Sequence, residues 1–266
     1  MSRPQNPPEQ PRPLDFSAHA RQAFERYINR RFGTEAAVFL GGSVQRGEAR
    51  LGSDVDAVVV LASSSHRARQ RIKTVQEGVP IDLAVYTMPG LAARIDREIR
   101  MANPWVLDIV GTGDVISNPR NKVTRAARSM AQRQLQAGPP EFTPAQRRPA
   151  LVEISELTDS LRSSKEPAEQ RFLAAALLPK LAAYHLRDNG QWIGKNRGLR
   201  RRLKEFDPQY TKALDQAVFE DLGKRGDIGP LVALTEKTLK AAGGLNRDIP
   251  TDIDPEPGFG GDAPKM

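Results

Sequence analysis

The fold is decided by residues 41–56, which read GGSVQRGEARLGSDVD. A short apolar run from Ala36 to Leu40 comes directly before this stretch, and a second run from Asp54 to Ala62 begins at its end. Short runs rich in Val and bounded by Gly or Ser predict two buried strands. Between them the two glycines predict a sharp turn, and Ser43 is a residue type that commonly begins a helix.

The glycine-serine turn also predicts a site for an anion. Gly41 and Gly42 leave the first strand without side chains in the way, so that backbone N–H groups remain accessible. The Ser43 hydroxyl adds a donor, and the start of a helix carries a partial positive charge. This arrangement suits a triphosphate.

Three aspartates predict a metal site beside that turn. Asp54 and Asp56 are two residues apart at the start of a strand, so both point to one face, with Cα atoms about 6–7 Å apart. Asp82 stands within an otherwise apolar run from Val79 to Tyr86, where a carboxylate is costly unless it is paired or binds a metal. Carboxylate oxygens are ligands for Mg²⁺, and two-metal sites are built from such groups.

Each of these features also has a plain structural interpretation. Gly-Gly-Ser is a common turn, Asp-x-Asp is often a solvated strand edge, and Asp82 on its own would serve as a cap or as half of a salt bridge. The functional interpretation depends on their combination, in this order, within one short region.

The rest of the chain predicts an α+β fold in two parts. Up to about residue 136, further strands (79–86 and 114–116) alternate with helices (from Phe16, 65–77 and 88–102), which indicates a short mixed sheet flanked by helices. After a Pro- and Gly-rich break, apolar residues recur only at helical spacing, which indicates a C-terminal helical bundle. We expect disordered tails at 1–14 and 245–266, a catalytic domain at 15–136, a linker at 137–149 and a helical domain at 150–244.

Composition limits the possible chemistry. Forty Lys and Arg against 32 Asp and Glu give a net charge of +8, which favours anionic partners or describes a solvated basic surface. The absence of Cys excludes disulfides and thiolate sites, and three scattered His make a His-rich metal site improbable. Neither a signal peptide nor a membrane-spanning apolar run is found, so we expect a cytoplasmic protein without membrane partners.

With these residues in place, the region 35–118 resembles the nucleotidyltransferase superfamily that includes DNA polymerase β. The resemblance is to its small bacterial branch of minimal and aminoglycoside nucleotidyltransferases, whose pattern is Gly-Ser, about ten residues, Asp-x-Asp and a later acid. Gly42-Ser43, Asp54, Asp56 and Asp82 match this pattern, and residues 46–49 are similar to the usual intervening residues.

The resemblance implies transfer of a nucleoside monophosphate from an NTP, expected to be ATP, to a hydroxyl acceptor, with pyrophosphate leaving. It implies that two Mg²⁺ ions are held by Asp54, Asp56 and Asp82, and that Asp82 is a candidate general base. It also implies that Gly41, Gly42, Ser43 and Arg46 bind the nucleotide.

A basic segment at 195–204 carries six Lys or Arg residues and no acid, and Lys195 at its start is a further candidate for binding the triphosphate. Leu199 and Leu203 are spaced to face inward on a helix, which would turn the arginines outward. Such a segment would bind phosphates or RNA, or be a solvated helix face.

Three functions remain open at this level. The first is an aminoglycoside-type enzyme that modifies a small molecule, and the second is a toxin-like enzyme that acts on RNA, such as a tRNA end, or on protein. The third is a non-catalytic nucleotide-binding regulatory module, against which the presence of all three acids argues. The sequence predicts neither the acceptor nor the oligomeric state.

Overall fold

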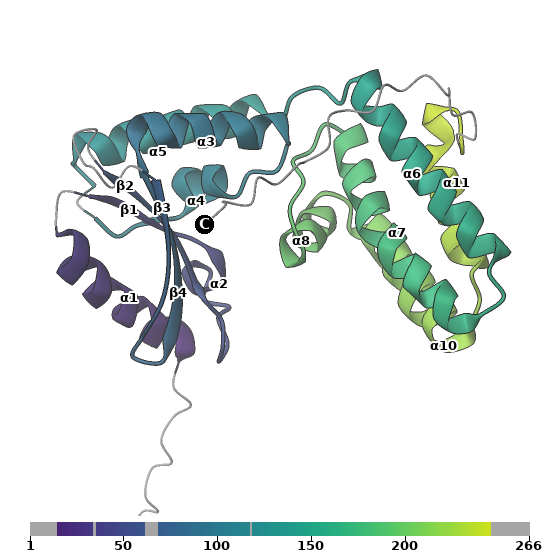
Figure 1. The fold of residues 1–266 in the computed structure, drawn as a ribbon, viewed down its shortest axis with the longest axis horizontal. Coiled ribbons are helices and arrows are strands. Elements are labelled where there is room, and N and C mark those ends of the chain that lie inside the picture. Colours follow the sequence, from purple (N-terminus) through teal and green to yellow (C-terminus); the bar gives the residue numbers. More distant parts are fainter. Residues whose placement is uncertain (1–14, 34–35, 62–68, 118, 246–266) are drawn as a thin grey trace, which may run out of the picture. The chain divides into compact units, whose positions relative to one another are not determined.

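The computed structural model describes residues 15–33, 36–61, 69–117 and 119–245 (Figure 1). These residues form two compact units: the first runs to Pro140 and includes Gly190–Gly194, and the second contains Glu141–Asn189 and the chain from Lys195 onward. The first unit holds a five-stranded sheet with helices, and the second holds helices, so the α+β class is confirmed. The predicted disordered tails lie outside the described residues, except for Leu245.

The sheet of the first unit has the strand order β3-β4-β2-β1-β5. The central pair, β2 and β4, is parallel, and every other pair is antiparallel, so the predicted mixed sheet is confirmed. The strands are β1 (Ala37–Leu40), β2 (Val55–Leu61), β3 (Arg69–Gln76), β4 (Val79–Thr87) and β5 (Asp114–Val115).

The helix predicted for 65–77 is wrong where the structure describes it, because Arg69–Gln76 is the edge strand β3. Exposed Arg71, Lys73 and Val75 alternate with the half-buried residues between them, which is the period of a strand. The two-residue turn that joins β3 to β4, Glu77-Gly78, has positive φ at both positions, as a tight hairpin requires. The polarity of the segment concealed this alternation.

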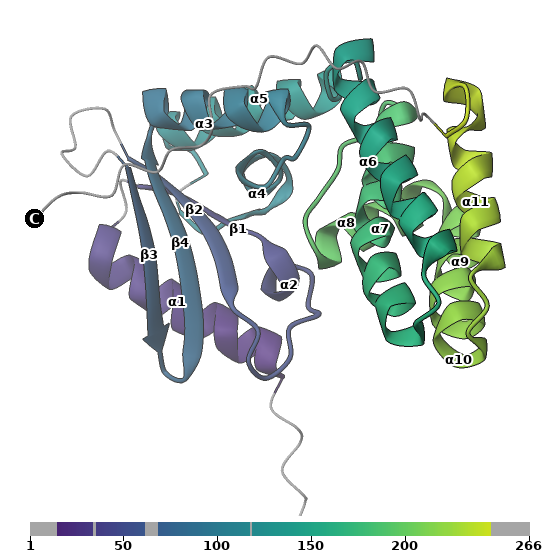
Figure 2. The same ribbon diagram turned by 45° about the vertical axis from the view of Figure 1, so that its right-hand side comes forward.

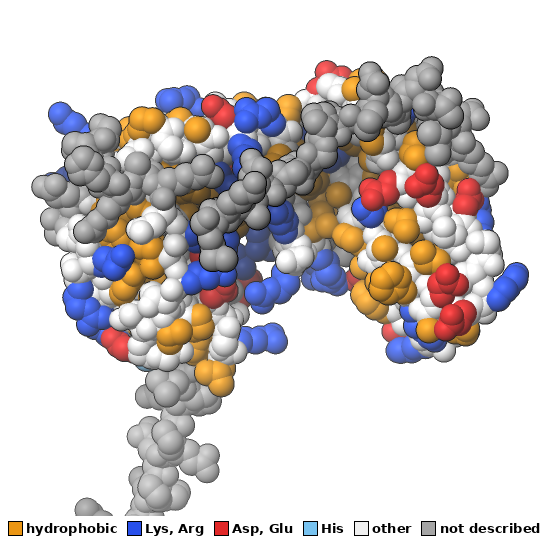
Figure 3. Space-filling view, viewed as in Figure 1, with side chains coloured by type: hydrophobic (Ala, Val, Ile, Leu, Met, Phe, Trp, Pro, Cys, Tyr) orange, Lys and Arg blue, Asp and Glu red, His pale blue; other side chains and the backbone are white. Residues whose placement is uncertain are grey.

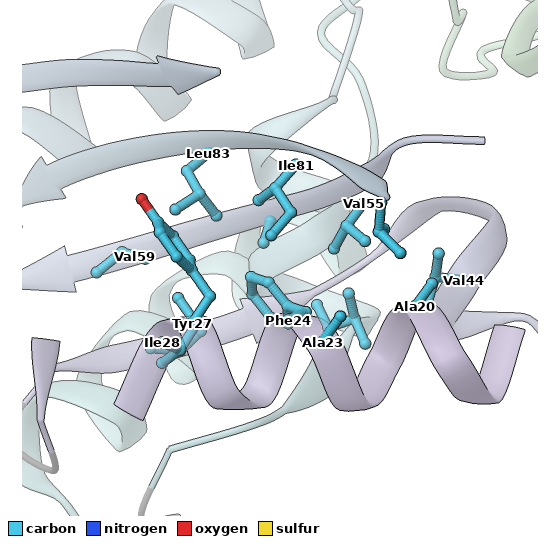
Figure 4. Packing of buried hydrophobic residues seen from close by; sticks show 14 of the residues in the cluster. Ala20, Ala23, Phe24, Tyr27, Ile28, Val44, Val55, Val59, Ile81 and Leu83 are labelled. Atoms are coloured by element: carbon cyan, nitrogen blue, oxygen red, sulfur yellow. The ribbon is translucent and has the colours of Figure 1, made fainter. Parts of the chain in front are cut away.

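Helix α1 (Phe16–Phe32) covers one face of the sheet (Figures 1 and 2). Asp15 caps its first turn by accepting from the N–H groups of Ser17 and Ala18. Its buried side chains, Phe24 among them, pack against the alternate residues of β2 and β4 that point to this face, which Figure 4 shows: Val55, Val59, Ile81 and Leu83.

Three helices cover the opposite face: α3 (Met88–Arg100), α4 (Val106–Thr112) and α5 (Lys122–Ala137). They pack over Val58, Val60 and Ala84, the other alternate positions of β2 and β4. Trp192 also joins this cluster, and the N–H of its neighbour Ile193 donates to the carbonyl of Ala102 at 2.9 Å.

The second unit is a helical bundle, as predicted. Its longest helices pack along each other, and a π-helical segment lies near its end. The elements are α6 (Pro144–Ser163), α7 (Pro167–Asp188), α8 (Arg197–Phe206), α9 (Pro208–Asp215), η1 (Gln216–Leu222), α10 (Gly223–Arg225), α11 (Gly229–Leu239) and η2 (Lys240–Ala242).

The linker between the units is shorter than the 137–149 predicted. Helix α6 already begins at Pro144, because Thr143 and Gln146 form a capping box and Pro is well accommodated at the first helical position. The prolines that suggested a linker thus mark a helix start. Among the described residues, no helix is both long and apolar enough to cross a membrane.

A buried carboxylate fixes the start of α4. Glu98, at the end of α3, is only 2% exposed. Its oxygens accept from the N–H groups of Val106 at 3.0 Å and Leu107 at 2.9 Å, and from Arg94 Nε at 2.9 Å. Because the first N–H groups of a helix have no partner within the helix, Glu98 takes the place of a cap.

We therefore expect Glu98→Ala to destabilise the first unit by about 2–4 kcal/mol, since two buried N–H groups lose their acceptor. The matched control is Glu25→Ala, which removes an exposed pair with Arg21 four residues away and should cost at most about 0.5 kcal/mol. Both tryptophans of the chain, Trp105 and Trp192, belong to the first unit, so urea unfolding followed by their fluorescence reports on it. Equal losses in the two variants would contradict this role of Glu98.

Candidate functional site

The register of the two parallel strands places Asp56 of β2 directly beside Asp82 of β4. Register partners on neighbouring strands point to the same face, about 4.8 Å apart. This is the face of Val58 and Ala84, opposite α1. The two acids lie near the beginning of their strands, and the strand pairing sets them side by side on one face.

The glycine turn lies against Asp56. Helix α2 (Gly42–Gln45) is a single turn that follows β1 directly, and the N–H of Gly41 donates to the backbone carbonyl of Asp56 at 2.9 Å. Gly42 has φ +70°, and a Cβ at this position would come within 2.5 Å of Asp56 Oδ2. Only glycine both adopts this positive φ readily and leaves room for the carboxylate, so the turn and Asp56 pack tightly together.

Asp82 is held by a bidentate ion pair with Arg71 of β3. Arg71 Nε donates to Oδ1 at 2.9 Å and Nη2 donates to Oδ2 at 2.6 Å, while Lys73 Nζ lies 3.8 Å from Oδ2. The Arg71 guanidinium holds the pKa of the Asp82 carboxyl below its ordinary value, although burial acts in the opposite direction. The salt-bridge interpretation of Asp82 is thus realised, and an ionised Asp82 with a lowered pKa is a weaker base.

Arg71 is the residue that sequence reasoning missed. It lies in the segment predicted to be helical, and a helix there would have no register with the strand that carries Asp82. A strand assignment for 69–76, joined by the Glu77-Gly78 turn to the next strand, would have placed Arg71 and Lys73 on the face of Asp82.

The other predicted site residues differ in their surroundings. Asp54 immediately precedes β2, is half-buried, and has neither a hydrogen bond nor an ion pair with any residue that the structure describes. Ser43 lies within α2. Arg46 follows α2 and pairs with Glu48 at 2.8 Å in an exposed loop. Their roles remain predictions.

The basic segment belongs to the second unit, and so does Lys195, which is exposed and remains a prediction. Helix α8 buries Leu199 and Leu203, as predicted. Two of its arginines are paired with acids of the same unit, Arg200 with Asp215 at 2.5 Å and Arg201 with Glu205 at 3.6 Å. Figure 3 shows Lys and Arg side chains gathered on parts of the visible face, with some Asp and Glu side chains beside them.

The acids near the glycine turn carry the type of ligand that a divalent cation prefers. Asp54 and Asp56 supply the oxygen ligands that Mg²⁺ prefers, and Asp54 has no competing partner in the described part of the chain. Within the same described residues, no three His, Cys, Asp or Glu side chains lie close enough together to hold a metal ion. The bidentate pair with Arg71 uses both oxygens of Asp82, the third predicted ligand.

Part of the first unit is similar to a known family of domains. Residues 21–102, from α1 to just past α3, match a family model described as a nucleotidyltransferase domain. A nucleotidyltransferase-like protein from Exiguobacterium sibiricum 255-15 is similar in structure, with a TM-score of 0.43 and 14% identity over 85% of this chain and 75% of that one. No curated protein gives a significant match.

The matched region, residues 21–102, lies within the first unit, and the family that it matches is that of nucleotidyltransferase domains, which transfer nucleoside monophosphates from NTPs with the help of divalent metal ions. The superfamily suggested by the sequence is supported. The aminoglycoside branch is a narrower statement, for which this match gives no evidence.

The contact between Gly42 and Asp56 gives a direct test. We expect Gly42→Ala to weaken Mn²⁺ binding at least about tenfold, because the new Cβ displaces the Asp56 carboxylate and supporting contacts of metal ligands are typically worth 10–100-fold. Gly47→Ala is the matched control: Gly47 has the same φ of +70°, but nothing lies within 4 Å of its added Cβ. It should cost about 1–2 kcal/mol of stability from backbone strain alone and leave Mn²⁺ affinity unchanged. Electron paramagnetic resonance of Mn²⁺ measures the affinity of each variant. Equal affinities in the two variants would contradict a metal site that depends on the contact between Gly42 and Asp56.

Proposed function

We propose that this protein is a metal-dependent nucleotidyltransferase that transfers the NMP of an NTP to a hydroxyl group of a small-molecule acceptor and releases pyrophosphate. The observation that carries the proposal is the packing of Gly42 against the Asp56 carboxylate, in a region that matches the nucleotidyltransferase domain family. ATP is the proposed nucleotide, on the resemblance to the small bacterial nucleotidyltransferases.

Asp54 and Asp56 are the residues that would hold the metal, since both carry oxygen ligands and Asp56 packs against the glycine turn. Bound Mg²⁺ would neutralise the triphosphate and stabilise charge on the reacting phosphoryl group. The N–H of Gly42 and the hydroxyl of Ser43 would bind the terminal phosphates. The N–H of Gly41, which the sequence also suggested for this role, already donates to the backbone carbonyl of Asp56. The protein would contribute by fixing the positions of the phosphate-binding and metal-binding groups relative to each other, because the glycine turn packs against Asp56.

The proposed reaction is an in-line displacement. The acceptor oxygen forms a bond to the α-phosphorus, the bond from that phosphorus to the bridging oxygen breaks, and pyrophosphate carries away the electron pair. The acceptor hydroxyl loses its proton to a base. The pair with Arg71 makes Asp82 a weaker base than its buried position alone would suggest.

A small acceptor is favoured over RNA by the way the basic residues are used. Arg200 and Arg201 of α8 are paired with acids, and Arg71 is paired with Asp82. Arginines that already hold carboxylates contribute less to binding a phosphate backbone, which depends on unpaired positive charge. RNA and protein acceptors are the alternatives that the following experiment separates.

The test is incubation of the protein with each of the four α-labelled NTPs, Mg²⁺ and a cell extract, followed by fractionation into small molecules, RNA and protein. We expect label in the small-molecule fraction together with released pyrophosphate. Asp56→Asn should lower the rate at least about a hundredfold, since it removes a charge that stabilises the transition state through the metal.

Asp114→Asn is the matched control, because Asp114 lies on the edge strand β5 and pairs with Arg21 at 2.5 Å. It should retain most of the activity. Label confined to RNA or protein would establish one of the alternative acceptors. Absence of label in every fraction with every NTP would contradict an enzymatic role and favour the regulatory module.

A further inference from the structure

The ion pair between Arg71 and Asp82 occupies the position where the family pattern predicts a metal ligand. Asp82 is the register partner both of Asp56 on β2 and of Lys73 on β3, so all three side chains point to one face of the sheet. Two acids this close repel each other and need a compensating charge. In this structure the charge comes from the protein itself, on the edge strand.

The pair uses the whole Asp82 carboxylate. Each oxygen accepts from a different nitrogen of Arg71, at 2.9 Å and 2.6 Å, in the fork geometry that arginine forms with carboxylates. The Asp82 side chain is 9% exposed, whereas that of Arg71 is 63% exposed. A nearly buried carboxylate requires a permanent partner, and the always charged guanidinium reaches it from the solvent side.

Asp54 has no ion pair with any described residue. Asp56 lies against the glycine turn, and its charge also acts on Arg71, but the bidentate pair of Arg71 is with Asp82. We propose that Arg71 holds the Asp82 carboxylate in place of a divalent cation, so that metal is bound by Asp54 and Asp56 without Asp82. Asp82 is then a positioning residue that anchors Arg71 beside the site.

This inference refines the proposed function, since it concerns the metal that the reaction uses. It can nevertheless fail separately, because Mn²⁺ binding is measured without nucleotide or acceptor. A protein that transfers no NMP would still give a definite answer about the three aspartates.

The experiment compares Mn²⁺ affinity, from electron paramagnetic resonance or water proton relaxation, in the wild type and single variants. Asp56→Asn should weaken binding at least about tenfold through loss of a ligand. Asp82→Asn should leave the affinity within about twofold of the wild type, because it removes no ligand. A loss in Asp82→Asn as large as that in Asp56→Asn would overturn the proposal, since Asp82 would then be a ligand that Arg71 releases.

Removal of the cation gives the complementary test. Arg71→Ala frees the Asp82 carboxylate to become a third ligand, and Mn²⁺ should bind at least about tenfold tighter. Lys73→Ala is the matched control: it removes the same charge from the same strand, but its Nζ is 3.8 Å from Asp82 and forms no bidentate pair. Its effect should be no more than about threefold, as expected for an exposed charge.

The double variant Arg71→Ala/Asp82→Asn identifies the source of the gain. If the freed carboxylate causes the tighter binding, the double variant returns to within about threefold of the wild type. Equal gains in Arg71→Ala and Lys73→Ala would reduce the effect to general electrostatics and contradict the proposal. The proposal would also be contradicted if neither the wild type nor Arg71→Ala bound Mn²⁺ at millimolar concentration.

Discussion

The parallel pairing of β2 with β4 is the constraint on which the site depends. Its register sets Asp56 beside Asp82 on the face away from α1. Because side chains alternate along a strand, a slip of one residue would turn Asp82 toward α1, into the cluster formed by Phe24, Ile81 and their neighbours. The apolar residues that alternate with the aspartates fix the register through burial, and the hydrophobic core thereby positions the acids.

The glycine turn is the second constraint, and it acts over a very short distance. Gly41 bonds to the backbone of Asp56, and Gly42 adopts a left-handed conformation with its Cα against the same carboxylate. A Cβ at either position would clash, with Ile109 in one case and with Asp56 in the other. The phosphate-binding and metal-binding halves that the family pattern implies are therefore adjacent by packing as well as by sequence.

The edge strand β3 changes the electrostatics of this arrangement. Arg71 and Lys73 project over the acidic face from the strand that ends the sheet, where long charged side chains are well solvated and also protect the edge from pairing with other strands. Their positive charges balance Asp56 and Asp82 locally. The acids then coexist on one face of the folded apo-protein without depending on bound metal for charge balance.

The sequence by itself determined the order of elements around Gly42, Asp56 and Asp82, the α+β class and the helical second part. These follow from local signals: apolar runs with defined lengths, glycines at strand ends and apolar residues at helical spacing. The Arg71 pair was decided only by tertiary structure, because Arg71 and Asp82 are joined through a hairpin whose strand was hidden by its polarity. The start of α6 could not be predicted either, since proline is common both at the first position of a helix and in loops. The capping contacts of Thr143 and Gln146 distinguish the two cases. Pairing between side chains from different strands depends on register, and register is set by the whole core rather than by any one segment.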